Sequence, residues 1–127
     1  MVVSDLALSW YCNNKHVLRF TVTDDDTVGS PAKDITGKYL KFALTKIVNG
    51  QPATKSTSVL IEKETGTGIV TTDGPNGICE VTVLDTDTEN LKPGDYYFEL
   101  ELFEPGPSDG LVIATGTATL LPNVVNP

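Results

Sequence analysis

Apolar and polar residues alternate over most of this chain, in short runs separated by turn-forming residues. The longest run extends from Tyr96 to Phe103, where every second residue from Tyr96 to Leu102 is apolar. A period of two indicates a β-strand with one buried face. Comparable runs lie near residues 6–10, 18–22, 40–44, 59–61, 69–70, 79–83 and 112–120, with Gly, Pro, Asn and Asp between them. The pattern predicts an all-β chain of about seven to eight strands.

One segment has a different character. Residues Asp85 to Leu91 are long enough for about one to two helical turns. Thr86 and Glu89 have the spacing of a capping box, in which the two side chains satisfy free backbone groups at a helix N-terminus. We therefore expect one short helical connection between two strands.

The turn before the longest strand carries the most structural information. Pro93 presets φ near −65°, and Gly94 accepts the positive φ that follows. A Tyr that opens a core strand after such a turn resembles a tyrosine corner, whose phenol binds the backbone across a Greek-key arch. With Tyr96 in that place, the sequence predicts an immunoglobulin-like antiparallel β-sandwich of about seven to eight strands with one short helical connection.

The length of 127 residues is that of one domain, and neither a repeat nor a long linker divides the chain. We expect a single sandwich domain over residues 1–121. Residues 122–127 contain two prolines and cannot continue a central strand. They are predicted to form an extended C-terminal arm.

Charge narrows the range of partners. The chain has 17 acidic and 9 basic residues and a net charge of −8. Nucleic acid and anionic membranes both require clustered Lys and Arg, so neither is an expected partner. No apolar run is long enough to span a bilayer, and the first residues lack the features of a secretory signal. Synthesis in a reducing cytosol favours free thiols at Cys12 and Cys79, with a disulfide as the alternative.

Catalytic chemistry has few candidates. His16 is the sole histidine, so any Ser-His-Asp or Cys-His arrangement would have to use it. It follows a polar turn, and a structural histidine at the start of a strand is the better interpretation. We expect no catalytic residues, no cofactor and no enzyme activity.

Two acidic groups are candidates for binding a hard cation such as Ca²⁺. Asp85, Asp87 and Glu89 resemble the start of a calcium loop, but Asn90 stands where the sharp turn needs Gly. Helix capping is the better interpretation of that group. A solvated turn is the better interpretation of the other group, which comprises Asp24, Asp25, Asp26 and Asp34. No metal site is predicted.

Some aromatic and apolar residues are predicted to lie outside the core. Alternation places Tyr97 and Phe103 on the face opposite to Tyr96, and an apolar outer row is typical of a protein interface. The candidate interface residues are Trp10, Tyr11, Phe103, Val124 and Val125.

Several of these segments resemble one family. They are similar to small immunoglobulin-like virion proteins of tailed bacteriophages, and in particular to the N-terminal domain of phage baseplate upper proteins. The resemblance covers about residues 6 to 122 and brings no catalytic residues. The segments that carry it are Arg19–Asp24, Asp34–Gly37, Leu40–Leu44, Gly68-Ile69, Asp85–Leu91, Leu91–Tyr96 and Ala114–Leu120.

This resemblance implies a non-enzymatic structural protein of a phage particle, made in the host cytoplasm and located in the virion. It would act as a tail or baseplate adaptor, or as a capsid cement (decoration) protein, through contacts with other phage structural proteins and copies of itself. We expect a homo-oligomer within a symmetric assembly. The chain ends soon after the sandwich, without a receptor-binding or fibre segment, which argues against host recognition. The alternative is a carbohydrate-binding or adhesin-like β-sandwich module, which would present aromatic rings as a flat platform.

Overall fold

The computed structural model describes residues 3–24, 29–48, 50–52, 59–103 and 110–125. The prediction of an all-β chain is confirmed, and the described residues form nine strands rather than seven or eight. The additional strand has two residues and extends the turn after the third strand. The strands are β1 (Val3–Tyr11), β2 (His16–Thr21), β3 (Tyr39–Val48), β4 (Gln51–Pro52), β5 (Val59–Thr65), β6 (Gly68–Asp73), β7 (Ile78–Val83), β8 (Gly94–Phe103) and β9 (Gly110–Leu121).

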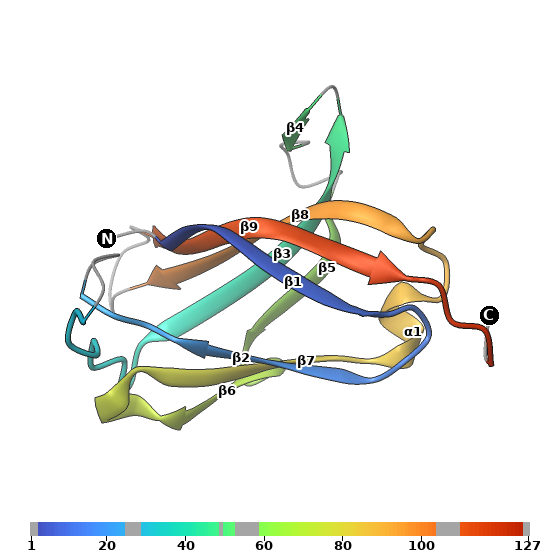
Figure 1. The fold of residues 1–127 in the computed structure, drawn as a ribbon. Coiled ribbons are helices and arrows are strands. Elements are labelled where there is room, and N and C mark those ends of the chain that lie inside the picture. The colour runs from blue at the N-terminus through green and yellow to red at the C-terminus, as the bar shows by residue number, and fades with distance from the viewer. Residues whose placement is uncertain (1–2, 25–28, 49, 53–58, 104–109, 126–127) are drawn as a thin grey trace.

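The strands curl into a nearly closed barrel of two layers (Figure 1). Their order is β1-β9-β8-β3-β5-β6-β7-β2, with β4 paired to β3. Strands β5 and β6 join through two residue pairs near the turn at Gly66. At this link the hydrogen-bonded sheet continues from one layer into the other. The larger layer contains β1, β9, β8, β3 and β5, and the smaller contains β6, β7 and β2. The β3-β8-β9 and β2-β7-β6 orders match the CFG and BED orders of an immunoglobulin sandwich.

Two strand pairs differ from the predicted antiparallel arrangement. β1 lies parallel to β9, in register from Leu6 opposite Gly116 to Tyr11 opposite Leu121, and β5 lies parallel to β6. The β1–β9 pair has the long crossover that parallel neighbours usually need, because the whole domain lies between the two strands. β5 and β6 are joined by the short turn at Gly66 and Thr67 and pair at only two positions. Alternation in sequence predicts strands but not the direction of a partner from the other end of the chain.

The predicted tyrosine corner is present. Tyr96 lies near the start of β8, and its hydroxyl donates a hydrogen bond of 2.6 Å to the carbonyl of Lys92. Gly94 has a φ of 148° at the start of the strand. The phenol therefore fixes the turn that carries the chain from α1 (Asp85–Thr88) into β8.

Helix α1 is shorter than expected and is capped differently. Its N-cap residue is Leu84, whose amide donates a 2.7 Å hydrogen bond to Oδ2 of Asp87. Lys63 approaches the same oxygen with Nζ at 2.8 Å. The predicted capping pair of Thr86 and Glu89 is wrong because the helix begins two residues earlier than that pair requires. Asp87 instead caps α1 and links it to β5.

Three phenylalanines join the two layers. Phe20 of β2 lies 6.3 Å from Phe42 of β3 and 6.1 Å from Phe98 of β8, and the Phe42 and Phe98 centroids are 5.9 Å apart. Phe98 follows Tyr96 by two residues, the place of the second disulfide cysteine in antibody domains. Phe20 lies on the strand that carries the first cysteine there. Aromatic packing thus occupies the position of that disulfide.

Both cysteines are buried free thiols, as the sequence analysis favoured. Burial, followed by the nearby charge of Glu80, raises the pKa of the Cys79 thiol to about 11. Cys79 pairs with Phe20 across the β2–β7 ladder, so it belongs to the core of the smaller layer.

Replacement of Tyr96 by Phe should lower the free energy of unfolding by about 0.5–1.5 kcal/mol, the usual contribution of one hydrogen bond. Urea denaturation measures this change. Tyr11→Phe removes a hydroxyl from an exposed ring and serves as the control, with an expected change within about 0.5 kcal/mol. A Tyr96→Phe protein as stable as the wild type would contradict the structural role of the phenol.

The thiol of Cys79 should resist Ellman's reagent at pH 8 while the protein is folded. With a pKa near 11, only about one thiol in a thousand is ionised at that pH, and the side chain is shielded from solvent. A Cys12→Ser background isolates Cys79, and urea should make it react completely. Rapid stoichiometric reaction of the folded protein would contradict the described packing.

Candidate protein interface

Trp10 belongs to the core and not to the outer surface. Its side chain is 3% exposed and stacks on His16, with centroids 5.7 Å apart and planes 5° apart. The indole Nε1 is buried without a hydrogen-bond partner in the described part of the chain. The prediction of Trp10 as an interface residue is therefore wrong. Alternation along β1 turns its side chain inward, and it lies opposite Leu120 of β9. His16 starts β2, as expected of a structural histidine.

Tyr11 points the other way and is 51% exposed. It lies beside the C-terminal arm, and together they line a shallow depression of about 500 Å³ with Asn14 and Pro122. Two of the candidate residues, Val124 and Val125, are 90% and 95% exposed and line it as well. The structure thus brings together three of the five candidates, and we call Tyr11, Val124 and Val125 the end patch.

The arm is held on the turn between β1 and β2. The Asn123 side-chain amide donates hydrogen bonds to the carbonyl of Cys12 at 3.0 Å and to Oδ1 of Asn14 at 2.7 Å. The amide of Val125 donates to Oδ1 of Asn123 at 3.0 Å. The turn itself is set by Asn13, which has a φ of 61°. The predicted arm of residues 122–127 therefore has a defined path as far as Val125, which is where the described residues end.

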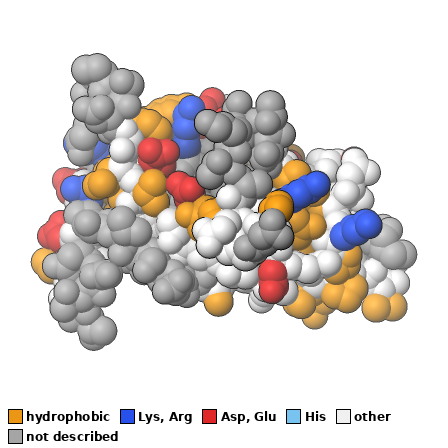
Figure 2. Space-filling view, turned by 90° about the horizontal axis from the view of Figure 1, so that it is seen from above, with side chains coloured by type: hydrophobic (Ala, Val, Ile, Leu, Met, Phe, Trp, Pro, Cys, Tyr) orange, Lys and Arg blue, Asp and Glu red, His pale blue; other side chains and the backbone are white. Residues whose placement is uncertain are grey.

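The exposed apolar side chains form separate groups on the surface. In Figure 2, hydrophobic side chains are frequent at the right-hand end, which carries the C-terminus in Figure 1, and occur in smaller groups elsewhere. Exposed valines and a tyrosine at one end of a domain are features of protein contact surfaces.

Phe103 lies at the other end of the β8–β9 pair, opposite Gly110. Its ring meets Tyr39 at 6.1 Å with an interplanar angle of 64°, and Nζ of Lys41 lies 5.9 Å from its centroid. A hydrogen bond to Glu64, followed by burial, raises the pKa of Tyr39. This crossed pair beneath a lysine differs from the flat platform that a sugar-binding module uses, and it is not continuous with the end patch.

Three of the acidic candidates, Asp34, Asp85 and Asp87, accept hydrogen bonds from backbone amides. Hydrogen bonds from the side chain and backbone of Thr36 lower the pKa of Asp34, and the backbone bond to Oδ1 is 2.9 Å. Asp25 and Asp26 lie outside the described residues. Within the described ranges, no three His, Cys, Asp or Glu side chains are grouped to hold a metal ion.

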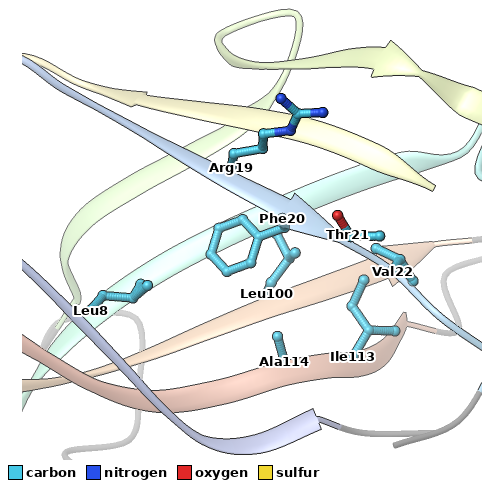
Figure 3. A pocket seen from close by; sticks show the side chains of 8 residues that line it. All are labelled: Leu8, Arg19, Phe20, Thr21, Val22, Leu100, Ile113 and Ala114. Atoms are coloured by element: carbon cyan, nitrogen blue, oxygen red, sulfur yellow. The ribbon is translucent and has the colours of Figure 1, made fainter. Parts of the chain in front are cut away.

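A second feature has no counterpart in the sequence analysis. The strand order ends at β1 on one side and β2 on the other, and a cavity of about 240 Å³ lies along the seam between these two strands (Figure 3). We call it the seam slot. Its walls are mostly apolar side chains from both layers. They comprise Leu8, Arg19, Phe20, Thr21, Val22, Leu100, Ile113 and Ala114.

No protein-family model matches the sequence, and no curated protein matches it either. Among the described residues, no helix has the length and apolar character needed to cross a membrane.

Proposed function

We propose that this chain is a non-enzymatic structural protein of a bacteriophage particle, acting as a tail or baseplate adaptor or as a capsid cement (decoration) protein. The observation that carries the proposal is the end patch. It presents exposed Tyr11, Val124 and Val125 on a turn that Asn123 fixes by hydrogen bonds. An apolar surface held in a fixed shape suits contact with another protein.

The fold and charge support the same proposal. The segments that resemble phage virion proteins lie in strands and turns of one sandwich, with the tyrosine corner between α1 and β8. The net charge of −8 keeps separate copies soluble before they assemble. The partners would be other phage structural proteins and further copies of this chain.

The environment of the sole histidine supports a non-catalytic role. His16 starts β2 and stacks against the buried Trp10. General acid–base catalysis needs several convergent groups around a reacting atom. We assign His16 to the packing of the β1–β2 turn instead.

The proposal predicts that the chain is a component of purified virions. Mass spectrometry of density-purified particles from a lysate that expresses the gene should find it in a fixed ratio to the major capsid or tail protein, and immunogold labelling should locate it on the particle. The host-cell lysate before assembly serves as the control for abundance. A chain that is abundant in the lysate and absent from the particles would contradict the proposal.

A further inference from the structure

The seam slot is bordered by two strands that each have a partner on one side. In the described residues, β2 pairs with β7 and β1 pairs with β9, and the two strands do not pair with each other. Such edges carry backbone groups that accept an added strand. The slot therefore combines free backbone edges with an apolar cavity behind them.

Part of the core is slightly exposed at this seam. The slot residues Phe20, Val22, Ile113 and Ala114 are 4–7% exposed, whereas the core residues Leu40, Phe42, Leu44 and Phe98 are at 0%. In Figure 3, the side chains of Phe20, Leu100 and Ile113 point into the space between β1 and β2. A side chain that enters the slot from outside would contact the core directly. Apolar cavities of about 150 Å³ already hold benzene, so about 240 Å³ has room for a valine.

The arm offers the complementary group. Val124 and Val125 are the most exposed of the large apolar residues in the described chain. Asn123 fixes the start of the arm on the β1–β2 turn, and residues 121–127 contain no charged side chain. The arm is therefore an uncharged apolar segment that already has part of the order it would need when bound.

The arm does not occupy the slot of its own molecule in the described residues. Val124 and Val125 line the depression of the end patch with Tyr11, and no residue of that depression lines the slot. Asn123 holds the arm on the β1–β2 turn, and the amide of Val125 bonds back to Asn123. Figure 1 shows the C-terminus beyond the end of β9, on the side of the molecule where the β1–β2 turn lies. The arm as described therefore leaves the slot open to the arm of a second copy.

We infer that the arm of one copy inserts Val124 or Val125 into the seam slot of a second copy, where it adds a short strand to the free edge of β2. The inference rests on the proposed assembly function and names the partner of the end patch. Because donor and acceptor are different surfaces, the contact is head-to-tail and closes a ring or extends a filament. It buries no carboxylate, since Arg19 is the one charged residue that lines the slot.

Sedimentation velocity over a concentration series tests the donor. Val124→Asp/Val125→Asp should weaken self-association by at least about tenfold, because tenfold corresponds to about 1.4 kcal/mol and burying one valine contributes at least that amount. The matched control is Val48→Asp/Val70→Asp, which adds the same charge at two exposed valines on β3 and β6. The control should associate like the wild type.

Disulfide trapping tests the acceptor in the full-length protein. Mixing a Thr21→Cys variant with a Val125→Cys variant should give a mixed dimer, because Thr21 lines the slot. Mixing Val70→Cys with Val125→Cys should give much less of it. Ala114→Leu fills the slot from within and should weaken association, and circular dichroism checks that this variant is folded.

Three results would overturn the inference. One is a wild-type chain that stays monomeric at all concentrations, and another is unchanged association of the Val124→Asp/Val125→Asp variant. The third is loss of association in Ala114→Leu while the Val124→Asp/Val125→Asp variant associates normally, which would assign the slot to a different segment. None of these results removes the chain from purified virions, so the failure of this inference and the failure of the proposed function are separate outcomes.

Discussion

A curled sheet must either pair its two edge strands or leave their backbone groups to another partner, and this constraint shapes the molecule. β1 is held in the larger layer by β9, and β2 is held in the smaller layer by β7. One tight turn at Asn13 joins the two strands, and the amide of Asn13 is fixed by Oγ1 of Thr88 at 2.8 Å. The chain thus crosses between layers at one end of the seam and does not close the seam along its length.

Aromatic packing joins the two layers, and no disulfide links them because both cysteines are free. Phe20, Phe42 and Phe98 meet in the centre of the core, and Tyr96 secures the turn into β8. Phe20 also forms a wall of the seam slot, so the same ring packs the core and borders the proposed binding site. A valine side chain that enters the slot would therefore extend the core of the domain.

Local chemistry in the sequence predicted local structure well. The period-two pattern identified β2, β3, β8 and β9, and the turn before Tyr96 identified the tyrosine corner. The errors have physical causes. Trp10 is a core residue because the inward phase of β1 includes it. The cap of α1 is Asp87 because the helix starts two residues earlier than the predicted capping pair requires. The parallel β1–β9 pair and the seam slot depend on contacts between distant segments, which alternation does not encode.

The account depends on a seam that is open in the single molecule and closed in the assembly. Amide hydrogen exchange measured by NMR tests this claim most directly, with dilute monomer compared with associated protein. The amides of β2 that point away from β7 should exchange rapidly in the monomer and be protected at least about tenfold on association, since a partner strand then accepts their hydrogen bonds. Protection of these same amides in the dilute monomer, or unchanged exchange on association, would contradict the account.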